Sequence, residues 1–258
     1  MFQNLKYLFR HAVLLLVVLL FMRSCFAVAF VPLEVVGSHL SVLPHLLFNV
    51  LRFDVQVVCY ILLLPTVLTL VFAVLRKSWA DRVLSRFRSI YFSIVSAFIL
   101  VISGIDLGFY ANFNSHINLT FFDFFNEGPL SLLQTIWEEY HCVYEAIAFL
   151  IVLLPVLWCI RRIERGSVSA FLSASPAPSA GRSVRRRICL SAVLLLYIAF
   201  LVIGLRGSVW RFPLQIEDTF VSDQKTLNDL VPNAVYMLKK AYKEKKDAFR
   251  MENTADLL

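Results

Sequence analysis

The sequence has few charged residues, and its long apolar runs have no polar face. Charged residues make up 17% of the 258 positions, whereas hydrophobic residues make up 59% and the mean hydropathy is +0.72. An ordinary soluble domain is about 25% charged. Runs such as AVLLLVVLLF and VLLLYIAFLVIGL contain no charge, which argues against a soluble helical core, where each helix keeps a polar face. The composition therefore predicts an all-α, polytopic membrane protein.

Several motifs that carry chemistry are also missing. The sequence contains no CxxC, HExxH, GxSxG, P-loop or GxGxxG pattern, so no catalytic, cofactor-binding or metal-binding residue is predicted. The five cysteines are interpreted as small apolar residues of the membrane segments: Cys25, Cys59, Cys142, Cys159 and Cys189. A metal site or membrane-embedded enzyme built from four histidines stays open as an alternative: His39, His45, His116 and His141.

Apolar blocks of the length that spans a bilayer, about 20 residues, occur along most of the chain. They predict five transmembrane helices, at about 8–33, 55–75, 90–110, 140–160 and 188–205. The first block resembles a signal peptide, because AVA at Ala27–Ala29 resembles a cleavage site. Because the apolar run is long and Arg23 interrupts it before that site, an uncleaved first helix is preferred.

Lys and Arg are concentrated in alternate connecting segments. The N-terminal end, the loop after the second span and the loop after the fourth are rich in them, whereas the two other loops carry only Arg52. By the positive-inside rule, the N-terminus is cytoplasmic and the tail after the fifth span is extracytoplasmic. The predicted location is a bacterial plasma (inner) membrane. The net charge of +7 is thereby attributed to topology, and no nucleic-acid partner is predicted.

Ionisable residues inside or beside membrane spans are functional candidates, because burying them in lipid is costly. With the predicted topology, five of them gather at the level of the outer leaflet: Arg23, Arg52, Asp54, Asp106 and Glu145. One hypothesis is a polar pocket for a lipid headgroup. The other is ion pairing between helices together with snorkelling to the interface. A GxxxG pattern at Gly104 and Gly108 indicates close helix packing within the chain.

Two segments outside the spans differ in composition. Residues 161–187 contain SASPAPSAG and are predicted to be a flexible cytoplasmic loop. Residues 206–258 are predicted to form an extracytoplasmic stalk. A helix is predicted at about 232–251 because Pro232 suits a first turn and, beyond it, an apolar stripe lies opposite a face rich in lysine. That helix could lie on the membrane surface, lie on a partner domain or stand in solvent.

Four stretches together resemble a known family. They are LFNVLRFD (47–54), SGIDLGFYANF (103–113), GLRGSVWRFPLQIEDTF (204–220) and LNDLVPNAVYML (227–238). The layout resembles the membrane domain of lipoteichoic acid synthase-like proteins, the sulfatase-type transferases of the alkaline phosphatase superfamily. Two positions depart from the family pattern: His116 replaces an expected basic residue, and Ala234 follows Asn233 where proline is usual.

The resemblance implies a cell-envelope protein with five spans, a stalk and a metal-dependent catalytic domain. In the family a threonine attacks a phosphatidyl lipid, and a divalent metal, usually manganese, stabilises the charge. These residues belong to the domain after the stalk, so none is carried over to this chain, which is expected to be inactive by itself and either truncated or naturally short. The resemblance extends to the stalk, where Arg206, Asn228 and Asn233 lie, and it implies a membrane anchor that presents lipid. The alternative is a small-solute transporter or accessory membrane protein.

Overall fold

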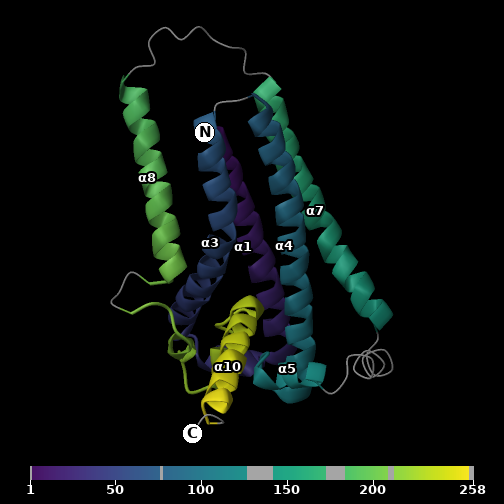
Figure 1. The fold of residues 1–258 in the computed structure, drawn as a ribbon. Helices are drawn as coiled ribbons and strands as arrows, with labels where there is room; N and C mark the ends of the chain where they lie inside the picture. The colour runs from purple at the N-terminus through teal and green to yellow at the C-terminus, as the bar shows by residue number, and fades with distance from the viewer. Residues whose placement is uncertain (1, 76–77, 127–141, 173–183, 209–211, 256–258) are drawn as a thin grey trace. The chain divides into compact units, whose positions relative to one another are not determined.

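A computed structural model describes residues 2–75, 78–126, 142–172, 184–208 and 212–255 (Figure 1). All regular structure in these ranges is helical, as the sequence predicts. The helices, in chain order, are α1 (Phe2–Phe30), α2 (Leu33–Ser38), α3 (Leu43–Leu75), α4 (Ser78–Phe113), α5 (Leu119–Asn126), α7 (Cys142–Leu172), α8 (Val184–Arg206), a 3-10 turn at Ile216–Thr219, α9 (Lys225–Asp229) and α10 (Ala234–Ala255).

Among the residues that the structure describes, four helices are long and apolar enough to cross a membrane. The qualifying segments are Asn4–Phe30 of α1, Leu43–Ala73 of α3, Asp81–Phe113 of α4 and Val143–Gly166 of α7. Their outward side chains are apolar and exposed, for example Ile94 at 64% and Ile151 at 65%. A soluble protein rarely leaves so much apolar surface in water, so the length and composition of these helices are those of a helical membrane protein. The apolar part of α8, Ser191–Arg206, is shorter.

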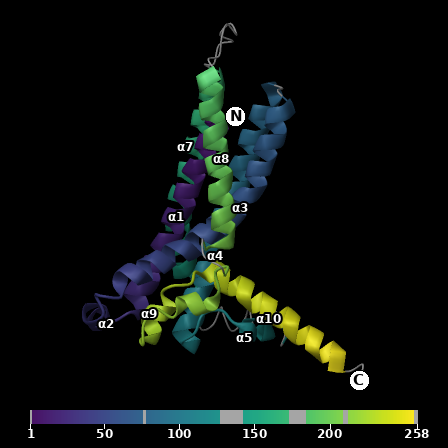
Figure 2. The ribbon, with the colours of Figure 1, turned by 90° about the vertical axis from the view of Figure 1, so that its left-hand side faces the viewer.

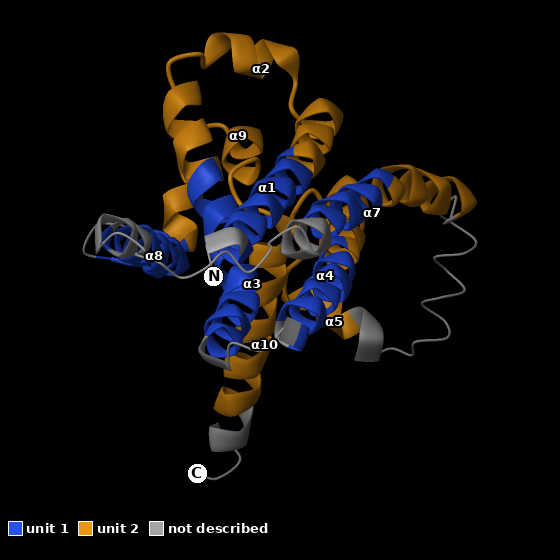
Figure 3. Cartoon of the chain, turned by 90° about the horizontal axis from the view of Figure 1, so that it is seen from above, with its two compact units in different colours: residues 1–20, 51–96, 155–215 blue, residues 21–50, 97–154, 216–258 orange. Residues whose placement is uncertain are grey.

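The chain divides into two compact units (Figure 3). Unit 1 contains residues 1–20, 51–96 and 155–215, and unit 2 contains residues 21–50, 97–154 and 216–258. Helices α1, α3, α4 and α7 each contribute residues to both units, whereas α8 belongs to unit 1 and α5, α9 and α10 belong to unit 2.

In unit 1, polar contacts fix the directions of the helices. Asn4 of α1 donates to Asp81 of α4 (3.0 Å), and the rings of His11 and Phe92 meet further along both helices, so α1 and α4 are parallel. The Tyr7 hydroxyl of α1 donates to the Gly166 carbonyl near the C-terminal end of α7 (2.9 Å). These contacts join the beginning of α1 to the beginning of α4 and to the later part of α7.

A proline inside α3 creates one of the links between α3 and α4. Pro65 has no N–H, so the carbonyl of Ile61, four residues earlier, loses its usual helical donor. The hydroxyl of Tyr91 in α4 donates to this carbonyl (2.8 Å). A second link, between the rings of Phe72 and Trp79, shows that α3 and α4 run in opposite directions. The kink-prone position is thus stabilised by the neighbouring helix.

Helix α8 packs closely on α3. A Cβ atom at Gly204 would lie 2.2 Å from the Cys59 Sγ, so only glycine permits this approach. Thr66, further along α3, contacts Tyr197, earlier in α8 (2.9 Å), which makes the helices antiparallel. The helix ends at Gly207, whose φ of +68° is the left-handed conformation typical of a glycine after a helix.

In unit 2, the first turns of α10 pack against α4 and α5 (Figure 2). Ala234 and Ala241 of α10 are buried with Ile102 and Phe109 of α4 and with Ile117. The aromatic rings of α5 extend this cluster, since Phe122 contacts Tyr242 of α10. The C-terminal segment is therefore part of a packed unit, in contrast to a stalk standing in solvent.

Helix boundaries differ from the predicted spans. The first helix ends at Phe30 before Pro32, where the prediction continued to residue 33, and α3 and α4 begin earlier, at Leu43 and Ser78. Helix α7 continues to Leu172 and α8 begins at Val184, so both enter the predicted 161–187 linker, whose SASPAPSAG stretch lies outside the described residues. Helix α10 covers Ala234–Ala255, where the sequence predicts a helix at 232–251.

Candidate functional site

A buried acid–histidine pair lies at the C-terminal end of α4 in unit 2. His116 Nδ1 is 2.8 Å from Asp106 Oδ2, and the other carboxylate oxygen accepts the Ile117 backbone N–H (2.9 Å). The turn that returns His116 to Asp106 includes Asn114 at φ 49°, a conformation that asparagine tolerates better than most residues. Asp106 and His116 are only 4% and 6% exposed.

His116 links this pair to the C-terminal segment. Its second nitrogen, Nε2, is 2.7 Å from the Asp229 carbonyl oxygen at the end of α9. With Asp106 ionised, both partners of the ring are acceptors, an arrangement that favours donation by both ring nitrogens and thus the cationic imidazole. Burial alone would lower the His116 pKa, but the hydrogen bond and charge of Asp106, with the contribution of Asp229, outweigh it and raise the pKa above its ordinary value.

Arg23 of α1 binds the same segment. One terminal guanidinium nitrogen donates to the carbonyl oxygens that follow α9: those of Leu230, Val231 (2.8 Å) and Pro232 (3.0 Å). These three carbonyls come directly after the last residue of α9, where the helix dipole also favours a cation. Arg23 therefore holds the backbone that follows α9.

Tyr110 completes the contacts with α9. Its hydroxyl donates to Asp229 Oδ2 (2.8 Å), and the same carboxylate lies 3.6 Å from the Lys225 ammonium. Lys225 also donates to the Asn114 carbonyl. We call Arg23, Asp106, Tyr110 and His116 the docking network, because they hold residues 229–232 against α1 and α4.

Two asparagines of the predicted stalk, Asn228 and Asn233, form hydrogen bonds that fix the backbone on either side of residues 229–232. Asn228 Oδ1 accepts the backbone N–H groups of Val221 and Ser222 (2.9 Å each), and its amide donates to the Ser222 carbonyl (2.8 Å). Asn233 Oδ1 accepts the Tyr236 N–H (2.9 Å), which is an N-cap for α10. These bonds define the turn before α9 and the start of α10.

The five residues predicted as an outer-leaflet cluster have different roles. Arg23 donates directly to the carbonyls of residues 230–232, whereas Asp106 is linked to Asp229 through His116. Glu145 is exposed in the first turn of α7. In unit 1, Asp54 is fully buried, and Arg52 Nε donates to the Gly207 carbonyl (3.1 Å). Arg52 therefore caps the end of α8, close to the predicted stalk residue Arg206, which is exposed.

Sequence reasoning missed a second polar cluster, in unit 1. Arg88 of α4 is fully buried and forms a bidentate pair with Glu164 of α7, at 2.9 and 3.0 Å. Ser85 donates to Glu164 Oε2 (2.7 Å), and Arg88 donates to Asn4 Oδ1 (3.2 Å). His11 Nε2 lies 3.4 Å from Glu164 Oε1. The available signal was Glu164, a single acid in the arginine-rich sequence RRIER.

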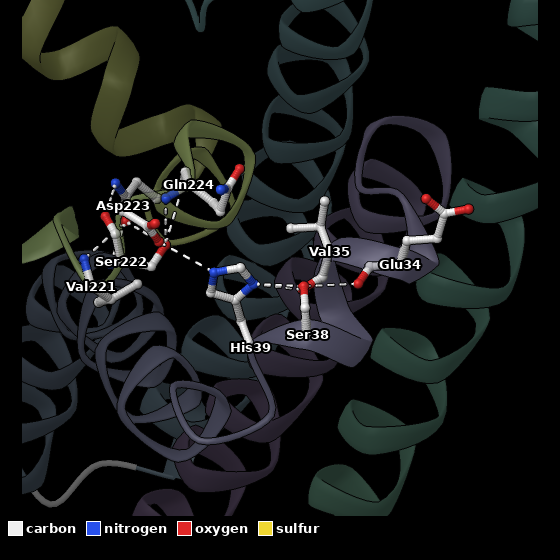
Figure 4. Close-up of polar contacts among 9 residues, drawn as sticks. Glu34, Val35, Ser38, His39, Val221, Ser222, Asp223 and Gln224 are labelled. Carbon is white, nitrogen blue, oxygen red and sulfur yellow. Dashed lines mark hydrogen bonds and ion pairs between the residues drawn. The ribbon is translucent and has the colours of Figure 1, made fainter.

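A serine, a histidine and an aspartate are arranged in a way that superficially resembles a hydrolytic triad: Ser38, His39 and Asp223 (Figure 4). His39 Nε2 is 3.2 Å from Asp223 Oδ1, and Nδ1 is 2.9 Å from Ser38 Oγ. However, Nδ1 is also 3.0 Å from the Val35 carbonyl, and the Ser38 hydroxyl lies 2.9 Å from the Glu34 carbonyl. A nitrogen that donates to Val35 cannot accept the serine proton. The group instead caps α2 and ties it to the C-terminal segment.

The docking network is expected to weaken as pH rises. A raised folded-state pKa means that the stability from cationic His116 is fully present below about pH 6.5 and is lost as pH rises through the folded-state value. Thermal unfolding in detergent between pH 6 and 9 should show this decline, at no more than about 1.4 kcal/mol per pH unit for one proton. His116→Gln should lower stability and flatten this dependence; an unchanged slope would show that another group titrates.

Within the residues that the structure describes, no three His, Cys, Asp or Glu side chains meet in a group that could hold a metal ion. His141, one of the four predicted outer histidines, lies outside these residues. Comparisons with protein-family models, with curated proteins and with solved structures found no match to the chain. The docking network and the Arg88–Glu164 cluster are therefore the two features of the chain that bear on its function.

Proposed function

We propose that α8 is a fifth membrane span and that the N-terminus lies on the cytoplasmic side of a bacterial plasma membrane. Within unit 1, α1 and α4 are parallel, α3 is antiparallel to α4, and α8 is antiparallel to α3. Five successive crossings require these directions. The distribution of Lys and Arg supports the same orientation.

We further propose that the chain is a membrane anchor that holds an extracytoplasmic segment in a fixed place. The observation that carries this proposal is the docking network, which joins α1 and α4 to the backbone of residues 229–232. Arg23 and Asp106, two of the five residues of the predicted outer-leaflet cluster, bind protein groups, which favours anchoring over lipid binding by these side chains. This role agrees with the resemblance to lipoteichoic acid synthase-like membrane domains, where a stalk follows the last span.

Replacing Arg23 tests the anchoring role. Arg23→Met removes the donor to three carbonyls, so backbone amides of residues 225–238 should exchange with deuterium about tenfold faster or more in lipid nanodiscs. Arg23→Lys should restore part of the protection, because it keeps the cation. Arg206→Met removes an exposed arginine and serves as the control. Equal exchange in Arg23→Met and the unmodified chain would refute the proposal.

Under the same proposal, these helices do not themselves catalyse transfer of a lipid headgroup. Purified chain in phosphatidylglycerol liposomes with manganese should release no headgroup above the protein-free background. Sustained turnover would show that the chain is itself an enzyme and that the anchoring role is at best secondary.

A small-solute transporter is the second candidate, and the buried Arg88–Glu164 pair favours it. Ionisable groups inside membrane helices often mark solute or proton pathways. In proteoliposomes, a transporter would move solute or protons faster than protein-free vesicles, and Glu164→Gln would abolish that flux while the protein stays folded. Flux at the background level would leave the pair with a structural role.

A further inference from the structure

Helix α10 has one face that packs on the protein. Ala234 and Ala241 are buried, Leu238 packs beside them, and the Lys245 ammonium lies 5.0 Å from the centre of the Phe122 ring. These residues recur at helical spacing, so the opposite side of α10 faces away from α4 and α5. The packed face accounts for the position of α10 but does not explain the residues on its outer face.

The outer face is a basic stripe, which we define as Lys239, Lys243, Lys246 and Arg250. All four are exposed and follow one another at intervals of three or four residues. Two exposed aromatic residues, Tyr242 and Phe249, border the stripe at 63% and 64% exposure. Glu244 pairs with Lys240 (3.2 Å) outside the stripe, whereas Asp247 is exposed and lies four residues after Lys243 and three before Arg250. The four basic side chains of the stripe outnumber this acid, so the face stays positive. The stripe therefore combines positive charge with neighbouring aromatic rings.

We propose that this basic stripe binds anionic phospholipid headgroups of the membrane that the chain crosses. Ala234 and Ala241 pack on Ile102 and Phe109, which belong to the apolar segment Asp81–Phe113 of α4. The beginning of α10 is thus attached to a membrane-spanning segment, and a lipid surface is within its reach. Lysine and arginine are attracted to anionic lipid phosphates, and aromatic rings favour the interface between membrane and water.

The inference rests on the proposed anchoring, because the docking network holds the start of α10 beside α4. The two ideas are separated by measuring two segments in one experiment. Hydrogen exchange of the full chain is compared in nanodiscs of phosphatidylcholine and in nanodiscs that also contain 30% phosphatidylglycerol, on the order of natural anionic lipid contents. Protection of residues 225–238 in both lipids reports docking. Protection of residues 243–255 that appears only with phosphatidylglycerol reports lipid binding.

A matched pair of variants identifies the side chains responsible. Lys243→Gln/Lys246→Gln removes two charges from the stripe, and Lys240→Gln/Lys245→Gln removes two charges from the same helix outside it. Each basic side chain near an anionic surface changes lipid affinity about fivefold, so two should change it about thirtyfold. The lipid-dependent protection should be lost in the stripe variant and kept in the control, and it should fall when salt is raised towards 1 M.

Three results would overturn the inference. The first is equal exchange of residues 243–255 in both lipids. The second is the same loss in both double variants, which would indicate net charge alone. The third is protection of residues 243–255 by soluble polyglutamate in phosphatidylcholine discs, together with no protection by phosphatidylglycerol. That result would indicate that the stripe binds an acidic protein. Continued protection of residues 225–238 in any of these cases would leave the anchoring role intact.

Discussion

Arg88→Met is expected to destabilise the protein by about 3–5 kcal/mol. Arg88 is fully buried, and its guanidinium donates two hydrogen bonds to Glu164. Removing the arginine leaves a carboxylate in a low-dielectric interior, supported mainly by the Ser85 hydroxyl. Breaking one side of a buried ion pair costs more than the pair contributes, because the remaining charge is uncompensated. The unfolding midpoint in detergent measures the loss.

A double variant separates the buried charge from other effects of the substitution. Arg88→Met/Glu164→Leu removes both charges and should recover most of the lost stability. Arg162→Met, at an exposed arginine of α7 that lies over the Trp158 ring, should change stability by about 0.5 kcal/mol or less. If Arg88→Met were as stable as the unmodified chain, the pair would not be a stabilising contact between α4 and α7.

Gly204→Ala is expected to disrupt the packing of α8 on α3, with a loss of about 1–3 kcal/mol. The added Cβ would lie 2.2 Å from the Cys59 Sγ and 3.2 Å from its Cβ. The sulfur can turn away, but the Cβ cannot, so the helices must separate slightly. Small residues permit close approach of membrane helices, where packing is a main source of stability. Thermal unfolding in detergent would report the change.

Gly104→Ala is the matched control for this prediction. Gly104 is also helical, yet a Cβ there would meet nothing within 4 Å. Alanine is favoured over glycine in a helix by roughly 0.5–1 kcal/mol, so this variant should be neutral or stabilised. Cys59→Ala should relieve part of the Gly204→Ala defect. Equal effects of the two glycine substitutions would show that close packing of α8 is not required.

Hydropathy predicted where the membrane helices are, but not where they begin and end. The apolar blocks predicted helices that overlap α1, α3, α4 and α7. Helix α4 nevertheless starts at Ser78, well before the predicted residue 90, because polar residues continue a helix as readily as apolar ones when neighbouring helices provide contacts. Arg88 was therefore assigned to a loop, although it lies inside α4 and is buried. The fifth span and the orientation remain predictions.

The candidate site was less predictable than the helices. Because charges within apolar segments are costly, the sequence drew attention to Arg23 and Asp106. Their partners could not be read from the sequence, since Arg23 binds backbone carbonyls, which every residue has, and Asp106 binds His116 after a turn of the chain. The ion pairing expected between helices occurs elsewhere, at Arg88 and Glu164, because pairing depends on which helix faces meet.

The docking network joins residues that are distant in the chain, and this has a consequence for biosynthesis. Arg23 and its first carbonyl partner, Leu230, are separated by 207 positions. At about 5–20 residues per second, a ribosome needs roughly 10–40 s to make the intervening chain. During that time the first helix enters the membrane with an arginine whose carbonyl partners have not yet been translated. The first helix must therefore insert with Arg23 unpaired by these carbonyls. We expect the intermediate in which only this helix has inserted to be the least stable stage of biosynthesis.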